Sequence, residues 1–197
     1  MFMKDFTRSL PAVTLVEPRL TNTLPQPVTR GMVAGTLLET AKGWIPVQHL
    51  KIGDAVQTLD GGLARIHALD RRILSPQSDL GLIHVPGGCH DACSDLMLVP
   101  GQHLLIDTLD AAPFVLVPAA ALTTDPLVRR HDLQTPTEII TLLFADEEVV
   151  FANSGVMIHC PGLMDGVGRY PDNSFFPRYD ILTARDFLRQ RATRLAA

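Results

Sequence analysis

The close spacing of turn residues constrains the fold of this chain more than any other feature. From Met32 onward, short apolar runs alternate with Gly, Pro and Asp about every eight to twelve positions, which is typical of an all-β domain. Residues 35–58 predict three short strands, separated by turns at Gly43 and at Gly53-Asp54. Asp60-Gly61-Gly62 and Asp146-Glu147 each lie between two apolar runs, so both predict β-hairpins.

The two ends of the chain differ from this β-rich centre. Residues 1–30 contain recurrent prolines, which disfavour helix and central strand, and they predict an extended arm. Residues 181–195 carry apolar side chains three and four positions apart, which predicts a C-terminal helix that Asp180 or Thr183 can cap. We therefore expect an arm at 1–30, a β domain at 31–165, and a linker and helix at 166–197.

The composition excludes several classes of partner. The chain has 197 residues, of which 46% are hydrophobic and 19% are charged, and this predicts a folded globule. The net charge of −4 indicates no basic surface, so we expect no nucleic-acid partner. No apolar run reaches the roughly 18 residues of a membrane span, so we expect no membrane partner either. A protein partner of unknown identity is the class that stays open.

The cysteine content indicates a reducing compartment. An odd and small number of cysteines argues against a disulfide framework; they are Cys89, Cys93 and Cys160. Pro11 and Pro18 interrupt any apolar stretch near residue 1, so a classical secretory signal is not predicted. We expect a cytoplasmic protein, or one that is secreted without a classical signal peptide.

Three blocks, in order, resemble the Hint domain of hedgehog proteins and inteins. They are residues 35–58, 96–106 and 138–153. The chain looks most like bacterial proteins with a single Hint domain of the alphaproteobacterial type. The resemblance implies an all-β horseshoe of many short strands, here with an extended N-terminal arm and a C-terminal helix. It also implies self-cleavage, in which a Cys or Ser at the first domain position attacks the preceding carbonyl and a His assists breakdown of the amide.

This chain departs from the family pattern at the nucleophile. The family's Cys-x-x-x-Gly-Thr spacing, counted back from Gly35, places Gly31 at the nucleophile position. The hydroxyl residue that the family carries three positions before its His is Pro100 here. His103 is therefore the catalytic candidate that the resemblance retains. From its chemistry alone, His103 can equally be a strand histidine with a satisfied hydrogen bond, because a histidine acts only with a partner in reach.

A nonstandard nucleophile is the alternative, and it would be Cys160 or Ser154 acting with His103. Residues 149–154 are similar to the intein C-terminus, where an asparagine cyclises. Asn153 and Ser154 match that ending, but Ala152 stands where a histidine would assist. An asparagine in a turn at the end of a strand is the simpler interpretation.

One short segment gathers four potential zinc ligands: Cys89, His90, Asp91 and Cys93. A tetrahedral site would need a second pair of ligands. His159-Cys160 is the available pair, and its spacing fits known zinc sites poorly. We expect a polar loop with free thiols here, with no metal and no cofactor.

Two hypotheses about function follow. The first is a Hint-type module that has lost the classical N-to-S acyl shift and acts as a structural or interaction domain. The second is an active autoproteolytic Hint domain that uses Cys160 or Ser154 with His103. Whether the chain is an enzyme depends on which hypothesis holds.

Overall fold

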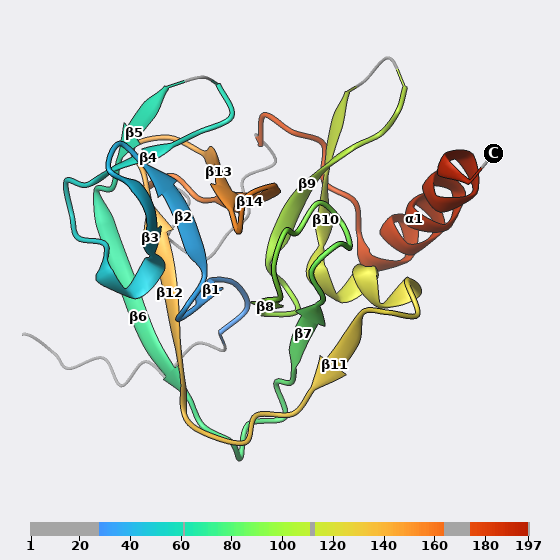
Figure 1. The fold of residues 1–197 in the computed structure, drawn as a ribbon, viewed down its shortest axis with the longest axis horizontal. Coiled ribbons are helices and arrows are strands. Elements are labelled where there is room, and N and C mark those ends of the chain that lie inside the picture. Colours follow the sequence, from blue (N-terminus) through green and yellow to red (C-terminus); the bar gives the residue numbers. More distant parts are fainter. Residues whose placement is uncertain (1–27, 61, 111–112, 164–173, 197) are drawn as a thin grey trace, which may run out of the picture.

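A computed structural model describes residues 28–60, 62–110, 113–163 and 174–196. The regular structure of these residues is mainly short strands in two curled sheets, and a helix lies at the C-terminal end (Figure 1). The all-β fold class and the C-terminal helix are thus confirmed. Most of the predicted arm, residues 1–27, lies outside the described residues, as does the predicted boundary between residues 165 and 166. The division into these three segments stays a prediction.

The first sheet contains, within the described residues, six strands in the order β11-β7-β8-β1-β12-β6. Their bounds are β1 Met32–Val33, β6 Ala68–Leu74, β7 Leu82–Val85, β8 Leu96–Leu98, β11 Arg129–His131 and β12 Thr137–Leu143. The two-residue β1 pairs antiparallel with β12 on one side and with β8 on the other. The start of the β domain is therefore held in the middle of this sheet.

The second sheet has the strand order β10-β9-β14-β13-β2-β4-β5, and β3 pairs with β2 beside this path. The bounds are β2 Leu37–Thr40, β3 Gly43–Pro46, β4 Ala55–Gln57, β5 Leu63–Arg65, β9 His103–Asp107, β10 Phe114–Pro118, β13 Glu148–Ala152 and β14 Val156–Cys160. Two short 3₁₀ helices follow β3 and β10; they are η1 Val47–His49 and η2 Ala119–Thr124. The sheet brings the start of β9 beside the end of β14.

One predicted hairpin is confirmed and the other is wrong. β4 and β5, which flank the predicted turn, pair antiparallel. Asp146-Glu147, by contrast, connects strands of different sheets, because β12 pairs with β6 and β1 whereas β13 pairs with β14 and β2. The hairpin partner of β13 is β14. Glu147 is turned toward β14 instead, where it contacts His159.

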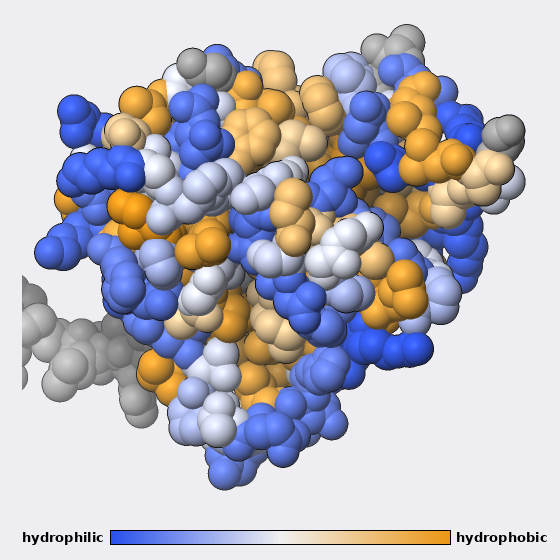
Figure 2. All heavy atoms as spheres, viewed as in Figure 1, coloured by the Kyte–Doolittle hydropathy of each residue, from blue (hydrophilic) through white to orange (hydrophobic). Residues whose placement is uncertain are grey.

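The helix α1, Ile181–Leu195, packs its buried residues Ala184 and Leu188 against η2 and β10. Its N-terminus is capped by Asp180, whose carboxylate accepts hydrogen bonds from the N–H groups of Leu182 and Thr183. Apolar and polar residues are interspersed over the face drawn in Figure 2, and the main apolar core lies between the curled sheets. No helix in the described part of the chain has the length and apolar character that a bilayer span requires.

Candidate functional site

Gly31 is the residue that the family spacing predicts at the nucleophile position, and its backbone excludes a side chain. Gly31 is buried just before β1 and has φ +126°, a conformation that residues with a Cβ rarely adopt. A Cβ at this position would lie 2.5 Å from Cγ2 of Ile139 and 2.9 Å from Oγ1 of Thr141, both on β12. Backbone and packing therefore both require glycine at the start of the domain.

Gln102 holds the peptide bond that precedes Gly31. Its Oε1 accepts a hydrogen bond of 2.9 Å from the Gly31 N–H. Its Nε2 donates to the carbonyl oxygens of His159, at 2.8 Å, and of His103, at 3.0 Å. Only 3% of Gln102 is exposed, so these bonds form away from water. One side chain thus joins the domain start to β9 and β14.

His103 begins β9 and lies beside this junction. Its ring faces that of His159 edge-on, with the ring centroids 6.4 Å apart. Burial, and then the positive charge of Arg178, lowers the pKa of His103 to about 4. At neutral pH the imidazole is uncharged, so it is available as a base and is a poor acid.

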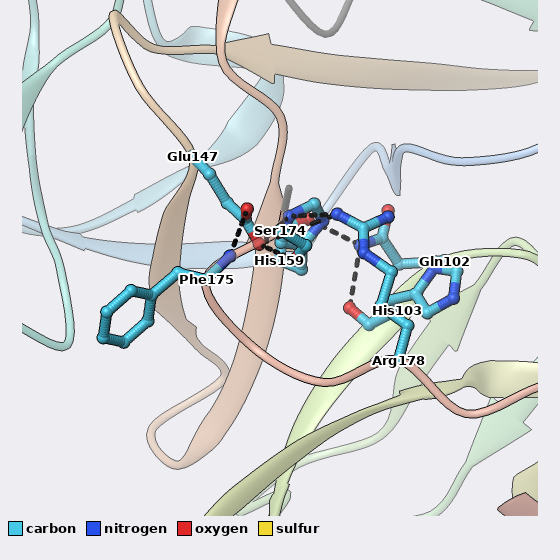
Figure 3. A network of polar contacts seen from close by, with 7 residues as sticks. All are labelled: Gln102, His103, Glu147, His159, Ser174, Phe175 and Arg178. Atoms are coloured by element: carbon cyan, nitrogen blue, oxygen red, sulfur yellow. Dashed lines mark hydrogen bonds and ion pairs between the residues drawn. The ribbon is translucent and has the colours of Figure 1, made fainter. Parts of the chain in front are cut away.

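Glu147, His159 and Arg178 form a buried polar cluster next to His103 (Figure 3). Nε2 of His159 lies 2.9 Å from Oε1 of Glu147 and 3.2 Å from Nη2 of Arg178. Burial lowers the pKa of His159, although the hydrogen bond to Glu147 acts in the opposite direction. Burial alone would raise the pKa of Glu147, but hydrogen bonds from His159 and Ser174 outweigh it and bring it to about 2. Glu147 is therefore the anion of the cluster.

The structure places the two alternative nucleophiles differently. Cys160 ends β14 with 1% of its surface exposed, and burial together with the charge of Glu148 raises the pKa of its thiol. Ser154 is exposed in the β13–β14 turn. Ser154 precedes Val156, the first residue of β14. At the usual rise of a strand, Val156 is already about 10 Å from His159. Ser154 is therefore remote from the two histidines.

Asn153 lies in the β13–β14 turn, and its side chain forms hydrogen bonds with three other residues. Its Oδ1 accepts from the Leu37 N–H at 2.9 Å, and its Nδ2 donates to Oγ of Ser94 and to the carbonyl oxygen of Asp95. Its φ is +46°, which asparagine tolerates better than most residues. These hydrogen bonds connect the turn to β2 and to residues 94–95. They support the interpretation of Asn153 as a turn residue.

The cysteine-rich segment lies over this turn and not beside His103. Cys93 is exposed, and its thiol donates to the carbonyl oxygen of Ser154 at 3.4 Å. The backbone of Asp91 approaches Gly155 so closely that a Cβ on the glycine would clash with it. Among the described residues, no three His, Cys, Asp or Glu side chains are grouped as metal ligands.

Residues 31–157 match a family profile described as the Hint domain. This chain belongs to the Hint domain family. The match begins at Gly31, so this Hint domain starts at the glycine whose amide Gln102 holds. The narrower resemblance to the alphaproteobacterial type stays a prediction. No functionally curated protein matches the chain.

Solved structures similar to this Hint domain include intein-like proteins. The bacterial intein-like domain from Clostridium thermocellum is 17% identical, with a TM-score of 0.51 over 66% of this chain and 98% of that one. The MchDnaB-1 intein (N145AA) is 14% identical, with a TM-score of 0.42 over 65% and 98% of the two chains. The gp41-1 intein is 10% identical, with a TM-score of 0.41 over 64% and 97%. At such identities the likeness is one of fold.

Sequence reasoning missed Gln102, Glu147 and Arg178. Gln102 had a weak signal, because it is an uncharged polar residue directly before His103 in an apolar segment. The sequence pattern predicts a hairpin turn at Glu147 and places Arg178 in the connection to the helix. These three residues come together only through long-range pairing, since Gly31 and Gln102 are 71 positions apart.

The low pKa of His103 makes stability depend on pH. In the unfolded chain its pKa is about 6.5 and in the folded chain about 4, so between these values the unfolded state binds more protons. The free energy of unfolding should therefore fall by up to about 3 kcal/mol as the pH drops from 7 to 4. Urea unfolding at a series of pH values measures this, and the variant His103→Asn should show a smaller fall. Equal pH dependence of both proteins would contradict the assignment to His103.

Proposed function

We propose that this Hint domain does not carry out the classical N-to-S acyl shift and acts as a structural or interaction module. The observation that carries the proposal is Gly31, which supplies no nucleophile and whose φ of +126° and tight packing against β12 admit no side chain. An acyl shift needs a side-chain sulfur or oxygen beside the preceding carbonyl. The fold is that of self-processing modules, but this chain has no nucleophile at the position where the first step of their chemistry begins.

The environment of the Arg30–Gly31 amide supports the same proposal. Breaking this bond requires a proton on the leaving nitrogen. The group that contacts this nitrogen is Oε1 of Gln102, a carboxamide oxygen that accepts hydrogen bonds and has no proton to give. Gln102 therefore stabilises the intact planar amide. The neutral His103, with its pKa of about 4, is a weak proton source as well.

The alternative of an active autoproteolytic domain relies on Cys160 or Ser154 with His103. His103 stays its catalytic candidate as a neutral base. The buried Cys160 thiol, with its raised pKa, forms little thiolate at neutral pH. Ser154 lies at the far end of β14 from His159. Both arrangements disfavour this alternative, so we place it second.

An intact-mass measurement separates the two proposals. The purified wild-type chain is incubated for a day at neutral pH with a thiol or with hydroxylamine, beside the variants Cys160→Ser and Ser154→Ala. A module without cleavage activity keeps the full mass of about 21.5 kDa in every sample. Fragments that form in the wild type and disappear in either variant would overturn the proposal and identify the nucleophile.

The location proposed for the module is the cytoplasm, or the cell exterior reached without a classical signal peptide. Cys89, Cys93 and Cys160 are all free thiols, which supports the cytoplasm, the reducing location of the two.

A further inference from the structure

Residues 174–179, which we call the strap, lie along the edge of β10. The N–H of Leu116 donates to the carbonyl oxygen of Pro177 at 2.8 Å, and the N–H of Tyr179 donates to the carbonyl oxygen of Leu116 at 3.0 Å. Leu116 and Arg178 thus form a parallel bridge. The strap thus pairs with the edge of β10 through one bridge, and pairing with a sheet edge is how many domains bind extended peptides.

Side chains of the strap occupy separate sites on the β domain. Ser174 donates from its hydroxyl to Oε1 of Glu147 at 2.6 Å, and the N–H of Phe175 donates to Oε2 at 3.2 Å. Phe176 packs in an apolar cluster with Leu105, Leu116 and Val149. Phe175, between them, is 82% exposed. Alternate side chains of the strap therefore contact the β domain, as they do in a strand at the edge of a sheet.

Arg178 carries the charge of the strap into the candidate site. Its guanidinium lies 3.2 Å from Nε2 of His159 and 3.6 Å from Oε1 of Glu147 (Figure 3). The Arg178 side chain is 17% exposed and that of Glu147 is 12% exposed. A shielded ion pair of this kind selects for a cation at one position, since a neutral residue would leave the carboxylate without its charge partner.

We infer that the β10 edge, Glu147 and His159 form a binding site for an extended peptide with the chemistry Ser-Phe-Phe-Pro-Arg-Tyr, and that the strap fills this site in the intact chain. The receptor groups all come from the β domain, at residues 105–159, whereas the ligand groups come from residues 174–179. The inference extends the proposed role as an interaction module and rests on it.

A bound strap competes with any peptide from another molecule. A tethered ligand acts at an effective concentration of the order of millimolar, so a free peptide of equal affinity is largely excluded. Weakening the strap without altering the receptor should open the site. Phe176 and Arg178 are suitable positions, because both belong to the strap and each contacts a different part of the receptor.

The test uses a fluorescent peptide of residues 174–180 and the full-length chain. The variant Phe176→Ala/Arg178→Ala should bind this peptide at least tenfold more tightly than the wild type does. A peptide with alanine in place of the residue matching Arg178 should bind the variant at least tenfold more weakly. Adding Glu147→Ala to the receptor should weaken binding, whereas adding Glu138→Ala, whose partner is Arg71 on the other sheet, should not.

Circular dichroism establishes that each variant is folded, and Phe176→Ala alone replaces the double variant if that one is not. A folded strap variant that binds the peptide no better than the wild type, or that binds the alanine peptide equally well, would overturn the inference. Intact masses of the same samples are recorded in parallel. Cleavage would refute the proposed function, and it would do so independently of the peptide result.

Discussion

Replacing Gly31 with cysteine is expected to destabilise the domain and to restore no cleavage. The substitution forces a side chain onto a backbone with φ +126° and places its Cβ 2.5 Å from Cγ2 of Ile139. The strained backbone and the overpacked core together should lower the free energy of unfolding by about 2–5 kcal/mol. The variant would still have Pro100, which has no hydroxyl, at the family's hydroxyl position, and Gln102 would still present an acceptor oxygen to the amide. Urea unfolding and intact mass measure the two effects.

Gly43 provides the matched control for the clash. Its φ is +97°, but no atom lies within 4 Å of a Cβ built on it. Gly43→Ala should therefore lower the free energy of unfolding through backbone strain alone, by about 1 kcal/mol. Gly31→Ala should cost clearly more. Equal losses for the two alanine variants would show that packing against β12 does not select glycine, and efficient cleavage by Gly31→Cys would show that the missing thiol was the only defect.

Gln102→Ala is expected to lower the free energy of unfolding by about as much as Gly31→Cys does. The substitution leaves the Gly31 N–H and the carbonyl oxygens of His103 and His159 without the Gln102 side chain, in a region shielded from water. Unsatisfied buried groups and the cavity left behind should lower the free energy of unfolding by about 3–5 kcal/mol. Urea unfolding followed by circular dichroism measures this loss.

Gln134→Ala is the control for the same chemical change. Gln134 is exposed and makes a local hydrogen bond to the carbonyl oxygen of Asp132. Its replacement should change the free energy of unfolding by less than about 0.5 kcal/mol. Hydrogen exchange gives a second readout, because the Gly31 amide should lose protection in Gln102→Ala. Unchanged protection there would contradict the role given to the Gln102 side chain.

The sequence predicted the elements that depend on residues close together in the chain. The β4–β5 hairpin follows from Asp60-Gly61-Gly62, since two glycines tolerate the turn and both flanking runs are apolar. The helix at 181–195 follows from its apolar spacing and from Asp180. The turn at Asp146-Glu147 looked the same in sequence, but strand pairing is decided by partners far along the chain. Local pattern could not show that β12 and β13 enter different sheets.

The candidate site was predicted in part. The family spacing counted from Gly35 indicated Gly31, and the second block that resembles the family indicated His103; both roles stay predictions. The burial that lowers the pKa of His103 and the contacts of Gln102, Glu147 and Arg178 depend on tertiary packing, as does the φ of Gly31. No local pattern encodes these features, because each joins residues from strands that meet only in the folded chain.

The central claim is that the Arg30–Gly31 peptide bond stays intact, and a fusion reports on it most directly. A fluorescent protein joined ahead of residue 1 of the wild-type chain would be released by cleavage at this bond during expression or during incubation with hydroxylamine. We predict a single full-length species by gel and by mass after both treatments. Release of the reporter with a new N-terminus at Gly31 would contradict the account.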